Sequence, residues 1–119
     1  MISADEICQT AIETMKERGK AYDDKQTRER SMASVVAAFN AATGHQLTEE
    51  QGWHFMTILK IVRSQQGDYK ADNYVDGTAY FALAGECADR HAPPKRKIVG
   101  YQEGFLGYDV PIYEDETEQ

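Results

Sequence analysis

Apolar residues recur at intervals of three and four positions in four stretches of the chain, the spacing that places them on one face of an α-helix. These stretches are residues 4–18, 31–43, 49–66 and 72–90. Glycines follow the first three, at Gly19, Gly44 and Gly67, and glycine commonly ends a helix because it adopts the left-handed conformation without steric cost. The pattern predicts an all-α fold, a small four-helix bundle.

Two of the helices begin with the sequence of a capping box, in which a hydroxyl and a Glu or Gln three residues later satisfy each other's backbone N–H groups. Ser3 and Glu6 form the first pair, and Thr48 and Gln51 form the second. Asp72 is a suitable N-cap for the fourth helix. The connection between the third and fourth helices is short, so the two are expected to pack as an antiparallel hairpin.

The helical periodicity predicts which side chains face the core. The expected core residues are Ile7, Ala11, Ile12 and Met15; Met32, Val35, Val36, Phe39 and Ala42; Phe55, Ile58, Leu59 and Val62; and Val75, Ala79, Ala82, Leu83 and Cys87. Between the first two helices, residues 19–32 are polar and lack a period, which indicates a loop, or a loop that leads into the first turn of the second helix.

The chain changes character after His91. Residues 92–119 are rich in Gly and Tyr, and the segments KIVGY and VPIY within them are expected to form short strands or an extended arm, followed by an acidic tail. We therefore divide the chain into a helical domain, residues 1–91, and a C-terminal arm, residues 92–119. A bundle of this size buries a modest core, so we expect a homo-oligomer whose interface includes the first helix or the arm with its aromatic residues. These aromatic residues are Tyr101, Phe105, Tyr108 and Tyr113.

The formal net charge of −7 limits the classes of partner. It opposes binding to a nucleic-acid backbone, because the phosphates would repel the protein. A basic protein partner, or a phosphate-bearing ligand held through a metal ion, suits this charge better. The two cysteines match no metal-ligand spacing, the N-terminus does not resemble a signal peptide, and no apolar run is long enough to span a membrane. The expected location is the cytoplasm.

Two carboxylates, Asp72 and Asp76, fall on the apolar face of the fourth helix. One interpretation is structural: Asp76 forms a partly buried ion pair with Arg63, which borders the apolar face of the third helix, while Lys60 lies toward the rim. The other is functional: Asp72 and Asp76 share one Mg²⁺, and Lys60 and Arg63 contact phosphate oxygens. Both interpretations remain open at this level.

Other candidate sites are weaker. The three histidines lack the spacing of a zinc site, and no glycine-rich phosphate-binding motif is present. Glu49 and Glu50 are expected to favour the N-terminus of the third helix through its dipole. Glu86 lies within the stripe of the fourth helix and is a weaker metal ligand of the same kind.

The segment RGKAYDD and residues 47–86 resemble a family of small uncharacterised domains common in bacteriophages and prophages. The resemblance covers about residues 18–90 and rests on the pattern M-x-x-x-K-x-x-R followed by D-N-x-x-D-x-x-x-Y. Here these positions are Met56, Lys60, Arg63, Asp72, Asn73, Asp76 and Tyr80. This family carries no settled activity, and we predict Lys60, Arg63, Asn73 and Tyr80 among the matched positions as ligand-binding residues. One departure is Asp23, which follows Tyr22 where the family has Gly.

The chain is also similar, more loosely, to the all-α nucleotide pyrophosphohydrolases of the MazG and dUTPase-like group. That similarity implies an oligomeric bundle with Mg²⁺ between acidic helices. In an enzyme of this kind, we expect Lys60 and Arg63 to be the catalytic residues that neutralise the developing phosphate charge. The chain departs from the group's E-x-x-E pair, because Glu49 and Glu50 are adjacent and the second motif is D-x-x-x-D.

Three functions follow as hypotheses. The first is Mg²⁺-dependent cleavage of a nucleoside triphosphate in phage nucleotide metabolism. The second is a non-enzymatic acidic phage protein that binds and inhibits a basic, nucleic-acid-binding host protein. The third is a nucleotide-binding protein without turnover. An enzyme or a nucleotide-binding protein needs Lys60, Arg63, Asp72 and Asp76 at an accessible cleft, whereas an interaction protein can bury them as ion pairs.

Overall fold

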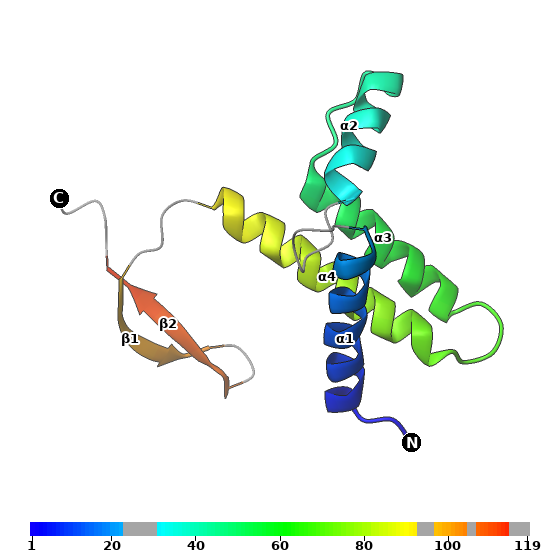
Figure 1. Cartoon of the computed structure of the whole chain (residues 1–119). Helices are drawn as coiled ribbons and strands as arrows, with labels where there is room; N and C mark the ends of the chain where they lie inside the picture. The colour runs from blue at the N-terminus through cyan, green and yellow to red at the C-terminus, as the bar shows by residue number, and fades with distance from the viewer. Residues whose placement is uncertain (23–30, 93–96, 105–106, 115–119) are drawn as a thin grey trace.

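The computed structural model describes residues 1–22, 31–92, 97–104 and 107–114, which form four helices followed by two strands (Figure 1). The helices are α1 (Ala4–Tyr22), α2 (Ser31–Thr43), α3 (Glu49–Ser64) and α4 (Ala71–His91). The strands are β1 (Ile98–Glu103) and β2 (Asp109–Tyr113). The prediction of an all-α fold with a non-helical C-terminal segment is confirmed. Among the described residues, no helix is both long enough and apolar enough to cross a membrane.

The helix starts follow the capping sequences. The hydroxyl of Ser3 accepts a hydrogen bond of 3.1 Å from the Glu6 backbone N–H. At α3 both bonds of the capping box are present, since Thr48 Oγ1 accepts from the Gln51 N–H and the Gln51 side chain accepts from the Thr48 N–H. The N-cap prediction for Asp72 is wrong, because α4 begins at Ala71 and its N-cap is Lys70, two residues before Asp72.

The predicted end of the first helix is also wrong. Helix α1 continues past Gly19 to Tyr22, and Gly19 is buried within it. A glycine inside a helix costs only about 1 kcal/mol, so it does not end a helix whose other residues pack against neighbours. Residues 19–22 of the predicted loop therefore belong to α1. Its residues 23–30 lie outside the described part of the chain.

Helices α3 and α4 form the antiparallel hairpin on which the other two helices pack. Gly67, with φ of +69°, makes the turn that connects them. An ion pair between Glu49 at the start of α3 and Arg90 at the end of α4 confirms the antiparallel direction. Helix α1 packs on α4, and α2 packs on the N-terminal part of α3 and extends away from the hairpin (Figure 1).

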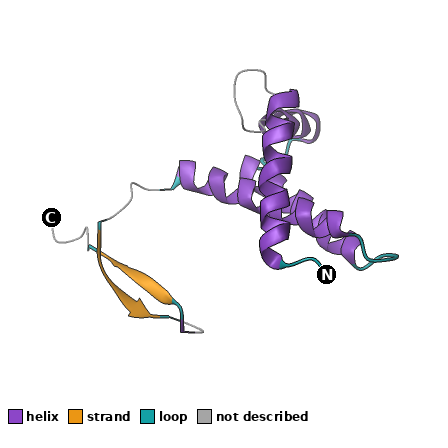
Figure 2. Cartoon of the chain, turned by 60° about the horizontal axis from the view of Figure 1, so that its bottom comes forward, coloured by secondary structure: helices purple, strands orange, loops and turns teal. Residues whose placement is uncertain are grey.

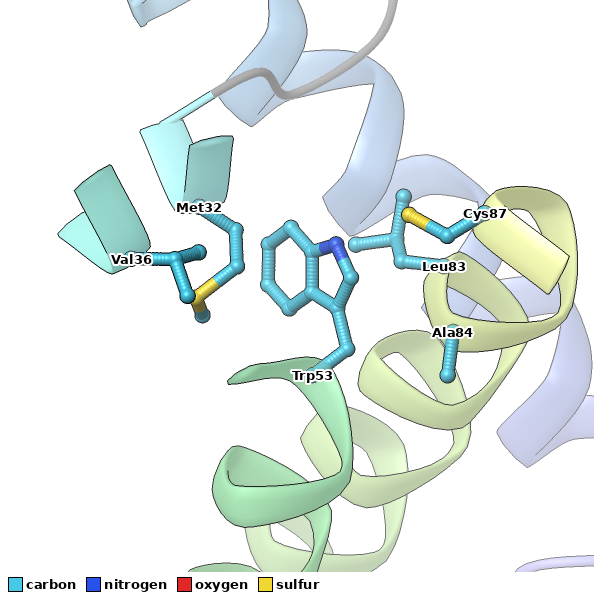
Figure 3. Close-up of a cluster of buried hydrophobic side chains, with 6 residues drawn as sticks. All are labelled: Met32, Val36, Trp53, Leu83, Ala84 and Cys87. Atoms are coloured by element: carbon cyan, nitrogen blue, oxygen red, sulfur yellow. The ribbon is translucent and has the colours of Figure 1, made fainter. Parts of the chain in front are cut away.

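The core consists of two small clusters. In the larger one, Trp53 of α3 lies between Met32 and Val36 of α2 and Leu83 and Cys87 of α4, with Ala84 beside them (Figure 3). The smaller cluster joins Ala11 of α1 to Val75 and Ala79 of α4. Each cluster thus ties a different helix to the hairpin.

The predicted core face of α3 is wrong. Phe55, Ile58 and Val62 expose 68%, 55% and 48% of their surface, and the buried face instead carries Trp53 and Lys60. Helix α3 is apolar on both sides, so its own periodicity does not decide which side packs on α4. The indole of Trp53 fills the space between three helices, and this contact selects the face. Other predicted core residues that are exposed are Ile12, Val35, Phe39, Ala42 and Ala82.

The two predicted strands are confirmed as an antiparallel hairpin, with Tyr101 opposite Pro111 and Glu103 opposite Asp109. The hairpin lies to one side of the helices (Figures 1 and 2). The strands carry exposed apolar residues, among them Tyr101, Val110 and Tyr113. Phe105, which was expected to contribute to an interface, and the acidic residues 115–119 lie outside the described residues.

Candidate functional site

Asp76 lies at the centre of a buried ion cluster formed by three helices. Its side chain contacts Lys60 of α3 at 3.0 Å, between Oδ2 and Nζ, and Arg18 of α1 at 3.3 Å, between Oδ1 and Nη2. Asp76 is only 5% exposed and Lys60 only 8%. The presence of two cations explains how a carboxylate is accommodated on the apolar face of α4, since a buried charge requires compensation.

The predicted pairing of Asp76 with Arg63 is therefore wrong. The α3 partner of Asp76 follows from the level of each residue along the hairpin, since each helical residue adds about 1.5 Å along the axis. Asp76 stands five residues from the start of α4 and Lys60 four residues from the end of α3, whereas Arg63 stands only one residue from that end. Arg63 is exposed and Lys60 is buried, the reverse of the expected order.

The ion cluster is joined to the hydrophobic core through aromatic rings. The Arg18 guanidinium lies 5.6 Å from the centroid of the Tyr80 ring, and Tyr80 stacks on Trp53 at 5.7 Å. Tyr80, which was expected to bind a ligand, packs against the core cluster of Trp53. Sequence reasoning missed Arg18, because its contact with Asp76 joins residues separated by 58 positions.

The carboxylates fit a magnesium ion poorly. Magnesium requires carboxylate oxygens that are free to coordinate it, and both oxygens of Asp76 already contact cations. Asp72 lies one turn earlier on α4 and is exposed. The described parts of the chain contain no group of three or more His, Cys, Asp or Glu residues placed to hold a metal ion. We therefore derive no chemical step through a metal.

A polar hollow of about 360 Å³ lies where α3 ends and α4 begins. It is lined by Lys60, Arg63, Gln66, Lys70, Asp72 and Asn73. Four of these residues were predicted site residues, so the structure brings Lys60, Arg63, Asp72 and Asn73 together, while it places Asp76 and Tyr80 outside the lining. Gln66 and Lys70 were missed, because their place in the connecting turn carries no motif.

The first turn of α4 lies at this hollow, and within it the Asn73 N–H already donates to the Lys70 carbonyl at 3.2 Å. The first N–H groups of a helix have no partner within the helix, and they favour negative charge through the helix dipole. Lys70 at the N-cap makes no capping hydrogen bond with its side chain. The hollow therefore combines the side chains of Lys60, Arg63 and Lys70 with a helix N-terminus, and we call it the cationic hollow.

A second hollow of about 370 Å³ adjoins the first and shares Lys60 and Asn73 with it. Its lining is mainly apolar and includes Ile61, Tyr74 and Phe81. All of its lining residues belong to α3 and α4.

At the other end of the hairpin, Cys87 lies beside an ion pair. Arg90 contacts Glu49 at 3.2 Å and donates a hydrogen bond of 3.0 Å to Cys87 Sγ. Burial and the neighbouring Glu49 carboxylate raise the pKa of the Cys87 thiol, and Arg90 opposes them with a smaller effect. A thiol with a raised pKa is a poor nucleophile, so Cys87 is no candidate for nucleophilic chemistry.

Comparison with known proteins gives a family and no activity. Residues 6–88 match the family model described as a domain of unknown function, DUF6378. The matched segment contains all four helices up to Ala88, including the cationic hollow and the buried ion cluster. No curated protein and no solved structure matches the chain.

Proposed function

Because the chain belongs to the DUF6378 family, whose function is unknown, we propose a function from the site itself: the protein binds a small phosphate-bearing ligand in the cationic hollow. A nucleotide is the ligand class we expect. The observation that carries the proposal is the convergence of Lys60, Arg63 and Lys70 on one hollow at the N-terminus of α4.

The charge of this hollow contrasts with that of the whole chain. The protein has a formal net charge of −7, yet three of the six residues that line the hollow are cationic and one is acidic. A local concentration of positive charge in an acidic protein attracts an anion of small size, while the surrounding charge repels a long polyanion. This combination favours a small phosphate ester over a nucleic acid.

Each side chain of the hollow suits a different part of such a ligand. The planar guanidinium of Arg63 can donate two parallel hydrogen bonds to one phosphate, and the ammonium of Lys70 adds a compact charge. Gln66 and Asn73 provide amide donors and acceptors. Asp72 would repel a phosphate, but its carboxylate can accept hydrogen bonds from sugar hydroxyls, which makes a nucleotide a better fit than inorganic phosphate.

Binding without turnover has more support than hydrolysis. Metal-assisted cleavage of a triphosphate needs carboxylates that hold the metal, and Asp76 has both oxygens against Lys60 and Arg18. Lys60 contacts Asp76 and the hollow at once, so it connects a bound phosphate to the buried cluster. The hypothesis of a nucleotide-binding protein is thus preferred to that of a pyrophosphohydrolase.

The test is isothermal titration calorimetry with ATP, with GTP and with pyrophosphate, each with Mg²⁺ and with a chelator. We compare the wild type with Arg63→Ala/Lys70→Ala and with the control Lys16→Ala/Lys20→Ala. The control also removes two positive charges, at exposed positions of α1. If the hollow is the site, the first variant loses affinity by tenfold or more, about 1.4 kcal/mol, and the control binds as the wild type does.

Two results would contradict the proposal. One is the absence of binding by the wild type to each of the three probes. The other is an equal loss of affinity in both double variants, which would reflect the overall charge of the protein instead of the hollow. Binding that requires Mg²⁺ and disappears in Asp72→Asn would restore the metal hypothesis in place of the metal-free one.

A further inference from the structure

The α3–α4 hairpin has an outer face that carries no formal charge. We define this outer face as the exposed residues of α3 between Gln51 and Val62 and of α4 between Tyr74 and Gly85. None of them is Asp, Glu, Lys or Arg. Charged residues make up 28% of the whole chain. On a solvated protein surface, about a quarter or more of the residues are normally charged. An uncharged face on two adjacent helices is therefore not an ordinary solvated surface.

Large hydrophobic side chains dominate this outer face. Phe55, Ile58, Ile61 and Val62 of α3 and Tyr74 and Phe81 of α4 expose between 41% and 68% of their surface. Helix α3 already buries its opposite side against α4 and α2 through Trp53 and Gly52. A helix that is apolar on both sides is normally buried on both sides, and no described residue of this chain covers the outer side of α3.

The outer face is continuous across the two helices. The rings of His54 on α3 and Phe81 on α4 lie 6.0 Å apart, and Ile61, Tyr74 and Phe81 line the same apolar hollow. On α3 itself, Phe55, Ile58 and Val62 follow one another at helical spacing. The face thus presents ridges of side chains with a hollow between them. The side chains of another helix can pack into such a surface.

We propose that the outer face is the interface with a second copy of this chain, in which the two α3–α4 hairpins pack face to face as a four-helix arrangement. The net charge of the chain favours a second copy as the partner at this face. Two copies with a net charge of −7 each repel one another wherever charged surfaces meet, and the outer face is where they meet without that repulsion. The carboxylate of Glu50, at the edge of the defined face, already pairs with His54 at 3.3 Å, so a basic partner protein would find little on this face to pair with.

The area of the face agrees with a dimer. A full aromatic side chain offers about 200 Å² and an Ile or Val somewhat less, so the six side chains together expose on the order of 600 Å² of hydrophobic surface. With the small and polar residues between them, the face approaches the roughly 800 Å² that each partner contributes to a specific interface. Two-fold symmetry lets the same face serve both copies.

The experiment compares the mass in solution of the full chain with the masses of two variants. The side chains replaced in the two variants have similar exposed fractions. Phe55 on the outer face is 68% exposed and Tyr101 on β1 is 65% exposed, so a carboxylate at either position is tolerated by the folded chain. By light scattering coupled to size exclusion, we expect the wild type at about twice the chain mass of 13.4 kDa. Phe55→Glu should run at the chain mass, and Tyr101→Glu should behave as the wild type does.

Circular dichroism of Phe55→Glu shows whether the helices persist, and Ile58→Ser, which adds no charge, is the second variant. A wild type that runs at the chain mass overturns the proposal. An oligomer that both Phe55→Glu and Ile58→Ser leave intact overturns it as well. If Tyr101→Glu alone dissociates the oligomer, the strand hairpin forms the interface instead and the proposal is wrong.

Discussion

Asp76 compensates the charges of two cations at once, so a substitution at this position removes this counter-charge from both. Its contacts with Lys60 and Arg18 lie at 3.0 and 3.3 Å, and the Lys60 side chain is almost fully buried. A buried ion pair adds little net stability, but the loss of one partner is costly because the other charge stays behind in a poorly solvated place.

We therefore expect Asp76→Ala to lower the free energy of unfolding by about 3 kcal/mol, since Lys60 loses its counter-charge. The measurement is urea denaturation followed by circular dichroism. Arg63→Ala is the control, because Arg63 is exposed, and its effect should stay within about 0.5 kcal/mol. A larger loss for Arg63→Ala than for Asp76→Ala would show that Arg63 is the structural partner after all.

At the scale of the elements, the contact between α2 and α3 depends on a residue without a side chain. A Cβ atom added to Gly52 would lie 2.9 Å from Met32 Cγ and closer still to Met32 Sδ. Met32 is buried in the core cluster and approaches the α3 backbone there because position 52 is glycine. This contact holds α2 against the rest of the molecule.

Gly52→Ala should accordingly destabilise the protein although alanine favours helices, because Met32 must leave its place in the core. Gly77→Ala is the matched control: its Cβ would meet only Lys60 Cβ, at an ordinary 3.5 Å. We expect Gly77→Ala to raise the melting temperature, since Ala is preferred to Gly in a helix by about 1 kcal/mol. Equal melting temperatures for the two variants would contradict the packing of α2 described above.

At the scale of the whole molecule, the chain is extended for its length. Its radius of gyration is 17.7 Å, whereas a compact domain of this size has about 13–14 Å. The helices share two small core clusters, and the strand hairpin lies to one side of them (Figure 2). Such a shape buries little surface within one copy, which agrees with the interface proposed on the outer face.

The strand hairpin should contribute little to the stability of the helices, because β1 and β2 hydrogen-bond to each other. A chain that ends at residue 92 should keep its helical circular dichroism signal, and its melting temperature should change by less than about 4 °C, which corresponds to less than about 1 kcal/mol. Loss of cooperative unfolding in this shortened chain would show that the hairpin stabilises the helical part.

The sequence determined the local features of this protein. The four helices, the capping box of Thr48 and Gln51, and the two strands after His91 all depend on residues within a few positions of one another, so local patterns predict them. The grouping of Lys60, Arg63, Asp72 and Asn73 was also predictable, because these residues flank one short turn.

Only the tertiary structure decided which faces are buried and which charges meet. Periodicity defines a face relative to the axis of its own helix, and α3 has two apolar faces, so the contacts of Trp53 were needed to choose between them. Asp76 meets Lys60 because of their levels along the hairpin, and it meets Arg18 because α1 packs on α4. These contacts join residues far apart in the chain, and no local pattern encodes the distance between such residues.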